Sequence, residues 1–233
     1  MLASFTASME RQIIPTADGS VTISIPATGL TYHSKHGAIQ ESMHVFIGAG
    51  LHHLLAKAIT HNPLRILEMG FGTGLNALLV LQESIRTGLS IHYETIEAFP
   101  LENVVYTRLN YCDQLQAPEL QSQFLRLHDS AWDITHAVTD RFSFLKRNTT
   151  LEKFSSPGLF DLIFYDAFAP SAQPELWTED VFRKLFDLLN PGGILTTYCS
   201  KGDVRRAMMA AGFTIEKIPG PPGKREMVRA GRA

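Results

Sequence analysis

The stretch LRILEMGFGTGLNALLVLQESI, residues 64–85, decides the fold. It opens with a short apolar run that ends in an acid, which is typical of a buried strand. Apolar side chains then recur at helical spacing, which predicts a helix over residues 75–85. Between the two patterns, Gly70, Gly72 and Gly74 form a G-x-G-x-G loop. Glycine lets a backbone turn sharply and approach a ligand closely, so this loop is a candidate binding element.

The alternation of strand and helix patterns continues along the chain. Such alternation favours a doubly wound, mostly parallel α/β sheet. These sheets bind ligands at the carboxyl ends of their strands, and three predicted strands end in an acid: Glu68, Glu97 and Asp166. The other predicted elements are strands at 91–96, 160–165, 194–199, 213–218 and 227–229, further strand structure in 132–144, helices at 101–109, 118–127, 178–189 and 201–210, and a turn at 191–193.

The N-terminal part of the chain has a different pattern. Asp18-Gly19 is a good hairpin turn between two apolar runs, and a helix is predicted to begin near residue 40. We therefore expect an extension, residues 1–60, that consists of a hairpin and a helix and packs on an α/β core, residues 61–233.

The composition is that of an ordinary globular protein. With 233 residues, of which 45% are hydrophobic and 19% charged, the chain can form one domain with a real core, or one domain with a small lobe. Its apolar runs are far shorter than the roughly 20 residues that span a bilayer, and its first residues lack the pattern of a signal peptide. Two cysteines, Cys112 and Cys199, cannot form a disulfide framework. We expect no membrane segment and a cytoplasmic location.

Charge is distributed unevenly along the chain. The net charge is −2, but the segment from Lys201 to the end holds eight Lys or Arg and three Asp or Glu, a net +5. The preceding 200 residues therefore carry −7. This asymmetry favours a polyanionic partner near the C-terminus, although a solvated basic tail would have the same composition.

The spacing of the glycine loop distinguishes between two cofactors. A dinucleotide fingerprint, G-x-G-x-x-G, would have its third glycine at the position of Leu75. The missing third glycine and the presence of Glu68 before the loop favour S-adenosylmethionine (SAM), which has no phosphate for the loop to bind. Glu97 lies 23 residues beyond Gly74, at the end of the next predicted strand. An acid at that place can accept hydrogen bonds from both ribose hydroxyls.

A second motif, YDAFAPSAQPELWT, occupies residues 165–178. Prolines such as Pro170 stiffen this loop at the predicted sheet edge. We expect Asp166 to take a proton from a substrate or to orient an amine. Phe168 or Trp177 can stack on a flat substrate, although either ring could belong to the core.

Together these motifs resemble the methyltransferase domain of the MnmC family. The resemblance rests on GFGTGLN, residues 70–76, on E-x-FPL from Glu97, and on D-x-FAP from Asp166 with a following W-T. The segment AGFTIEKIPGPPGKREM resembles the end of that domain, and YHSKHGAIQESMHVFIGAG resembles the stand-alone MnmD-type members. The resemblance covers nearly the whole chain.

The resemblance implies a class I SAM-dependent methyltransferase with a Rossmann-like, mostly parallel, seven-stranded sheet. The implied reaction is N-methylation of the 5-aminomethyl group of 5-aminomethyl-2-thiouridine at the tRNA wobble position, which gives 5-methylaminomethyl-2-thiouridine. In bifunctional relatives a fused FAD-dependent oxidase forms the aminomethyl group. No residues remain for that domain in this chain, so we expect methyl transfer only, with a separate enzyme or another route supplying the substrate.

The motifs and the resemblance together define the candidate site. Asp166 is the candidate catalytic residue, either as a base or as a positioning group. No metal is expected. The candidate cofactor-binding residues are Glu68, Gly70, Phe71, Gly72, Thr73, Gly74, Asn76, Glu97, Ala98, Asn148, Asp166, Tyr32 and Ser34. The candidate substrate and tRNA contacts are Phe168, Pro170, Trp177, Lys201, Arg205, Arg206, Lys224 and Arg225.

One departure from the family pattern concerns adenine. Relatives often carry a Gly-Asp pair at the end of the fourth strand, whereas Arg147-Asn148 stand at the matching place here. The side-chain oxygen of Asn148 can still accept a hydrogen bond from the adenine amino group.

Other functions remain open at this point. A SAM-dependent methyltransferase for a small-molecule amine would have the same glycine loop and acids, and so would a more distant aminopropyl transferase. An RNA-binding protein without cofactor chemistry would have the same basic tail. The intact GFGTG loop, Glu97 and Asp166 argue against this last alternative.

Overall fold

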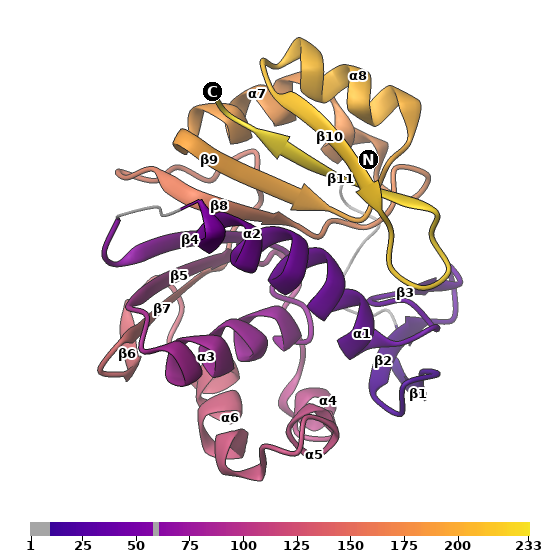
Figure 1. The fold of residues 1–233 in the computed structure, drawn as a ribbon. Coiled ribbons are helices and arrows are strands. Elements are labelled where there is room, and N and C mark those ends of the chain that lie inside the picture. Colours follow the sequence, from indigo (N-terminus) through magenta and orange to yellow (C-terminus); the bar gives the residue numbers. More distant parts are fainter. Residues whose placement is uncertain (1–9, 58–60) are drawn as a thin grey trace.

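The computed structural model describes residues 10–57 and 61–233. At its centre lies an eight-stranded sheet with the strand order β10-β11-β9-β8-β4-β5-β7-β6 (Figure 1). In that order, the strands are β10 (Thr214–Pro219), β11 (Glu226–Gly231), β9 (Leu189–Thr197), β8 (Phe160–Tyr165), β4 (Leu64–Met69), β5 (Ile91–Ile96), β7 (Phe142–Arg147) and β6 (His136–Thr139).

The strand directions are those of a doubly wound sheet. Strand β4 pairs in parallel with β5 and β8, and the parallel pairing continues to β7 on one side and β9 on the other. Strand β11 lies antiparallel between β9 and β10. The predicted mostly parallel α/β fold is therefore confirmed. Strand β6, antiparallel to β7, is an additional edge strand beyond the seven expected.

Helices cover both faces of the sheet (Figure 1). Successive residues of a strand point to opposite faces, so Ile66 and Leu67 of β4 lie in two different hydrophobic clusters. The first cluster lies under α1 (Ala38–Ser42), the π-helical segment η2 (Met43–His52), α2 (His53–Ala56), α3 (Leu75–Thr87) and α6 (Gln121–Asp129). The second lies under η4 (Pro174–Trp177), α7 (Glu179–Asp187) and α8 (Gly202–Ala210). Three short helical turns precede α6: α4 (Asn103–Tyr106), α5 (Tyr111–Gln114) and η3 (Pro118–Leu120).

The N-terminal extension contains the predicted hairpin and helix. Strands β1 (Gln12–Pro15), β2 (Val21–Ile25) and β3 (Leu30–Thr31) form a separate three-stranded antiparallel sheet. Ile23 of this sheet and Val45 of η2 share a hydrophobic cluster with strands of the main sheet, so the extension packs on the core. The division at residue 60 stays a prediction, since 58–60 and 1–9 lie outside the described residues.

Two local predictions differ from the structure. The helix expected over 101–109 is limited to the single turn of α4. The turn expected at 191–193 lies within β9, where the register against β8 shifts between Phe160 and Leu162. The Pro-Gly-Gly sequence therefore forms an irregularity within a strand instead of separating a helix from a strand.

A substitution at Phe164 of β8 measures how much packing between the helical layer and the sheet contributes to the free energy of unfolding. Its ring is fully buried and lies 5.1 Å from the ring of Phe46 in η2. We expect Phe164→Ala to lower the free energy of unfolding by about 3–5 kcal/mol, because a large buried ring leaves a cavity. Urea denaturation measures the change. As a control, Ile85→Ala, at a position that is 52% exposed, should change stability by less than about 0.5 kcal/mol. A loss below about 1 kcal/mol for Phe164→Ala would show that this contact is not important.

Candidate active site

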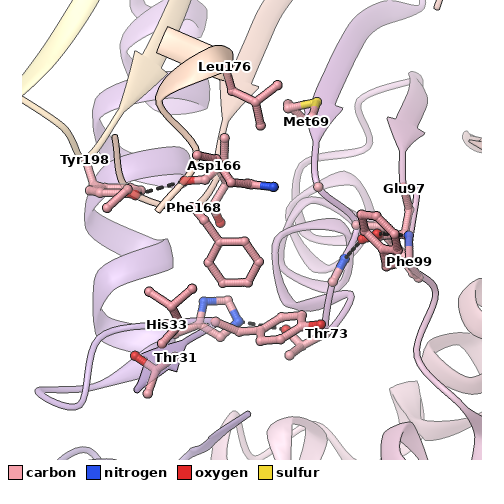
Figure 2. Close-up of a pocket in the computed structure, with 18 of the residues that line it drawn as sticks. Thr31, His33, Met69, Thr73, Glu97, Phe99, Asp166, Phe168, Leu176 and Tyr198 are labelled. Carbon is pink, nitrogen blue, oxygen red and sulfur yellow. Dashed lines mark hydrogen bonds between the residues drawn. The ribbon is translucent and has the colours of Figure 1, made fainter. Parts of the chain in front are cut away.

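A cavity of about 460 Å³ opens at the carboxyl ends of β4, β5 and β8 (Figure 2). Its walls come from the loops after these strands, from β3 and the segment that follows it, and from Tyr198 beyond β9. All three loops predicted from the sequence therefore meet at one place. The volume and mixed polar and apolar walls are those of a small-molecule site.

The glycine loop after β4 forms the floor of this cavity. Gly70, Gly72 and Gly74 all have positive φ angles, of 90°, 49° and 73°. A Cβ atom at Gly72 would lie 3.1 Å from the ring of Tyr32, and one at Gly74 would lie 2.8 Å from the ring of His128. The loop therefore needs glycine for both conformation and space.

Glu97 lies opposite the glycine loop and has a fixed orientation. One carboxylate oxygen accepts the backbone N–H of Gly72 at 2.9 Å, and the other accepts the backbone N–H of Phe99 at 2.7 Å. A carboxylate oxygen can accept a further hydrogen bond. Glu97 therefore presents two acceptors side by side, which matches a pair of ribose hydroxyls.

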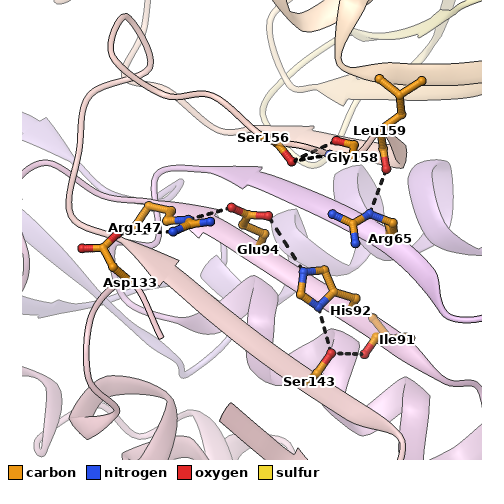
Figure 3. A network of polar contacts seen from close by, with 10 residues as sticks. All are labelled: Arg65, Ile91, His92, Glu94, Asp133, Ser143, Arg147, Ser156, Gly158 and Leu159. Atoms are coloured by element: carbon orange, nitrogen blue, oxygen red, sulfur yellow. Dashed lines mark hydrogen bonds and ion pairs between the residues drawn. The ribbon is translucent and has the colours of Figure 1, made fainter. Parts of the chain in front are cut away.

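The predicted adenine contact, Asn148, does not line the cavity. This side chain is exposed and donates to the backbone oxygen of Glu97 at 3.3 Å. The preceding Arg147 donates to the buried Glu94 at 2.9 Å on the face of the sheet drawn in Figure 3. Thr150 and Leu151, a few residues further on, do line the cavity. Sequence reasoning missed them because no motif marks this loop.

These residues fit SAM. The glycine cradle leaves no room for a side chain, Glu97 offers two adjacent acceptors, and the cavity walls include apolar groups such as Leu151 and Met69. Thr73 is held by a 2.7 Å hydrogen bond to His33, whose pKa burial lowers to about 4. Of the predicted cofactor residues, those that line the cavity are Tyr32, Ser34, Gly70, Phe71, Gly72, Thr73, Asn76, Glu97, Ala98 and Asp166.

Asp166 lies at the end of β8 and faces the cavity (Figure 2). Asn76 donates to its carboxylate at 3.2 Å. Burial, followed by the negative charge of Glu41, raises the pKa of Asp166 to about 7, although Asn76 and Lys224 act in the opposite direction. A carboxylate with this pKa can exchange a proton near neutral pH.

Glu68 is buried in β4, next to the site, and does not line the cavity. It is 1% exposed, and burial raises its pKa to about 8. The nearby charge of Asp166 raises the pKa of Glu68 further, whereas the neighbouring polar side chains of Thr95, Asn76 and Tyr93 lower it. Glu68 is therefore neutral when Asp166 carries the charge.

The two aromatic residues of the second motif have different places. Phe168 lines the cavity and meets Tyr32 edge to face, with ring centroids 5.4 Å apart. Trp177 is only 5% exposed and packs on Tyr165, and its indole N–H donates to the backbone oxygen of Phe168 at 2.8 Å. Trp177 is thus a core residue that holds the loop, and it is not placed to stack on a substrate. Pro170 lies in the same loop outside the cavity wall.

Of the predicted basic contacts, Lys224 lines the cavity. Its ammonium lies 2.6 Å from a carboxylate oxygen of Glu41 and 3.7 Å from the centre of the Tyr198 ring. Glu41 and Tyr198 were not predicted, because Glu41 has the sequence context of an ordinary surface acid on a helix. The remaining predicted contacts, Lys201, Arg205, Arg206 and Arg225, lie outside the cavity wall.

Within 10–57 and 61–233, no three His, Cys, Asp or Glu side chains are grouped so that they could hold a metal ion. Over the same residues, no helix is long and apolar enough to cross a membrane.

Comparison with known proteins agrees with this site. Residues 116–233 match the family model described as S-adenosyl-L-methionine-dependent methyltransferase, and the chain belongs to this family. SAM is therefore its cofactor, and methyl transfer is its class of reaction.

Individual relatives narrow the comparison to one group of methyltransferases. The chain is 33% identical over 210 residues to the tRNA 5-methylaminomethyl-2-thiouridine biosynthesis bifunctional protein MnmC of Leptospira borgpetersenii, and 31% identical over 205 residues to that of Pseudomonas putida. Each alignment covers 84% of this chain and 31% of the relative, so the chain spans about a third of their length. The crystal structure of MNMC2 from Aquifex aeolicus superposes with a TM-score of 0.76 at 26% identity, covering 96% of this chain and 71% of that one. The resemblance to the MnmC methyltransferase domain is confirmed.

Glu97→Gln tests the cofactor site. The amide group of glutamine cannot accept both backbone N–H donors, so we expect S-adenosylhomocysteine to bind at least about tenfold more weakly. Isothermal titration calorimetry measures the affinity. Glu102→Gln, on the exposed start of α4, is the matched control and should bind as the wild type does. Unchanged affinity in Glu97→Gln would exclude this carboxylate from cofactor binding.

Asp166→Asn tests whether this carboxyl is held neutral by burial. The folded protein keeps it protonated up to about pH 7, whereas its ordinary pKa is 3.8. This carboxyl therefore lowers the stability of the wild type as pH rises through this window, and the variant lacks that contribution. We expect similar stabilities near pH 4, and a variant that is more stable by up to about 4 kcal/mol near pH 8.

Urea denaturation over this pH range measures the effect. Asp180→Asn, at an exposed position of α7, is the control and should show no comparable gain in stability near pH 8. A pH-independent difference for Asp166→Asn would show that the pKa of Asp166 is not raised in the folded protein.

Proposed function

We propose that this protein N-methylates the 5-aminomethyl group of 5-aminomethyl-2-thiouridine at the wobble position of tRNA and produces 5-methylaminomethyl-2-thiouridine. The observation that carries the proposal is Asp166, a carboxylate with a pKa of about 7 in the cavity that also holds the glycine loop and Glu97. The similarity to MnmC proteins, whose name gives this nucleoside as their product, supports the choice of substrate.

The reaction requires the amine in its neutral form, because an ammonium ion has no lone pair. When bound, SAM supplies the methyl group: the new C–N bond forms as the S–C bond breaks, and S-adenosylhomocysteine leaves with that bond's electron pair. Asp166 accepts the proton that the amine must lose, and Asn76 holds the carboxylate toward the cavity through its 3.2 Å hydrogen bond. Holding the amine in line with the methyl group supplies much of the remaining rate enhancement.

Phe168 and Tyr32 are suited to hold the base. Both rings line the cavity, and Phe168 belongs to a loop that the Trp177 hydrogen bond fixes. An aromatic ring beside the reactive group can stack on an unpaired base of a tRNA loop. The indole of Trp177 thereby contributes through the position of Phe168.

The basic side chains outside the cavity are suited to bind the tRNA backbone. Lys201 is exposed just before α8, Arg206 is exposed in the middle of α8, and Arg225 is exposed on the loop between β10 and β11. Binding through such groups weakens as salt rises, because each neutralised phosphate releases counterions. In this proposal a separate enzyme or another route forms the aminomethyl group, and the protein acts in the cytoplasm, where tRNA is modified.

Bulk tRNA from cells that lack this protein provides the direct test. The tRNA is incubated with purified protein and SAM, and its nucleosides are analysed by mass spectrometry. We expect one methyl group on 5-aminomethyl-2-thiouridine, at a rate that rises as pH increases through about 7. Asp166→Asn should lower the rate by about 100-fold or more while S-adenosylhomocysteine still binds.

Asp180→Asn is the matched control and should keep the wild-type rate. No methyl gain on any nucleoside, although SAM binds and the aminomethyl substrate is present in the tRNA, would contradict the proposal. A small-molecule amine would then be the next substrate to test.

A further inference from the structure

The cavity wall contains an alkylammonium group, that of Lys224. This lysine belongs to the loop between β10 and β11, and its ammonium extends to Glu41 in α1 at 2.6 Å. The same ammonium lies over the Tyr198 ring, 3.7 Å from its centre. A carboxylate together with an aromatic face is a typical binding site for an organic cation.

Glu41 is built to hold a cation at this place. Its side chain is 10% exposed, and its second carboxylate oxygen accepts the backbone N–H of Ser34 at 2.7 Å. The Tyr198 hydroxyl donates to the backbone oxygen of Ala167 at 2.8 Å, which fixes the ring beside Asp166. Both partners of the ammonium are therefore held by contacts that do not involve Lys224.

Lys224 is the less constrained member of the pair. Its side chain is 33% exposed, and it extends from a connecting loop. A long lysine side chain can keep its stem packed while its charged end reaches water. Glu41 is buried and cannot follow it.

The charges around this position favour exchange of one cation for another. Glu41, Asp166, Lys224 and His33 line the same cavity, and the charges of Glu41 and Lys224 act on the pKa of both Asp166 and His33. Burial lowers the pKa of His33 to about 4, so that ring is neutral at neutral pH. If Lys224 left without replacement, Glu41 and Asp166 would be two close carboxylates without a counterion, which is costly in a buried site.

We propose that Lys224 occupies, in the free protein, the site of the substrate's own ammonium group, and that Glu41 is the carboxylate that binds this group when the substrate enters. A primary aminomethyl group has the same –CH₂–NH₃⁺ end as lysine. The substrate thus displaces Lys224, is held by Glu41 and Tyr198, and gives its proton to Asp166 nearby. The displaced Lys224 moves into solvent next to Arg225. The inference rests on the proposed function only in taking an aliphatic amine as substrate.

The test compares two free nucleosides in the presence of S-adenosylhomocysteine. Isothermal titration calorimetry gives the affinity of 5-aminomethyl-2-thiouridine and of 2-thiouridine, which lacks the amine. We expect the wild type to prefer the aminomethyl nucleoside. Glu41→Gln should reduce this preference by about tenfold or more, the loss expected for a hydrogen bond to a charged group.

The Lys224→Met variant distinguishes this inference from a purely structural role of the ion pair between Lys224 and Glu41. Methionine keeps an apolar stem but removes the competing ammonium, so we expect the aminomethyl nucleoside to bind several-fold more tightly than to the wild type. If the ion pair only held α1 to the β10–β11 loop, both variants would weaken binding alike. Lys217→Met, which removes an exposed lysine of β10, is the matched control and should leave both affinities unchanged.

Three outcomes would overturn the inference: equal affinities of the wild type for the two nucleosides, a preserved preference in Glu41→Gln, or weaker aminomethyl binding in Lys224→Met. Affinity for S-adenosylhomocysteine and the melting temperature of each variant show whether it is folded. Should Glu41→Gln not fold, Glu41→Asp replaces it and should retain part of the preference. Intact discrimination between the nucleosides without methylation of tRNA would reject the wobble-uridine reaction and retain the ammonium site.

Discussion

The cofactor site depends on the way one carboxylate joins two loops. Glu97 accepts backbone N–H groups from Gly72 in the loop after β4 and from Phe99 in the loop after β5. The pairing of β4 with β5 also continues into the loop after β4, because the backbone N–H of Gly70 donates to the backbone oxygen of Ile96 at 2.9 Å. The two loops are therefore positioned by contacts within the protein itself. Such preorganisation reduces the ordering cost of binding.

Local sequence patterns were sufficient for the fold and for the acids at the strand ends. Glu97 and Asp166 each end an apolar run, and a parallel sheet brings the carboxyl ends of its strands to one edge. The parallel pairing of β4 with both β5 and β8 does this here. The glycine spacing was equally informative, because positive φ is a requirement on the backbone that a sequence records directly.

Contacts between distant segments could not be predicted in this way. Glu41 and Lys224 are 183 residues apart, and nothing in the pattern around either residue identifies its partner. The aromatic residues of the second motif were ambiguous for a related reason. Phe168 and Trp177 belong to one loop, and only its packing decides which ring faces the cavity and which enters the core. Its position makes Asn148 the predicted adenine contact, whereas the conformation of the following loop brings Thr150 and Leu151 to the cavity wall.

The surroundings of the two acids at the ends of β4 and β8 explain why Asp166, and not Glu68, is the functional carboxylate. Burial raises the pKa of both, to about 8 for Glu68 and about 7 for Asp166, and the charge of Asp166 adds to the shift at Glu68. Two close carboxyl groups cannot both ionise at low cost. Asp166 has the lower of the two pKa values, and it lines the cavity, where the ammonium of Lys224 lowers its pKa. Its charge then keeps Glu68 protonated, so that Glu68 remains a neutral buried group beneath the glycine loop. The negative charge is thus confined to the carboxylate that the amine can reach.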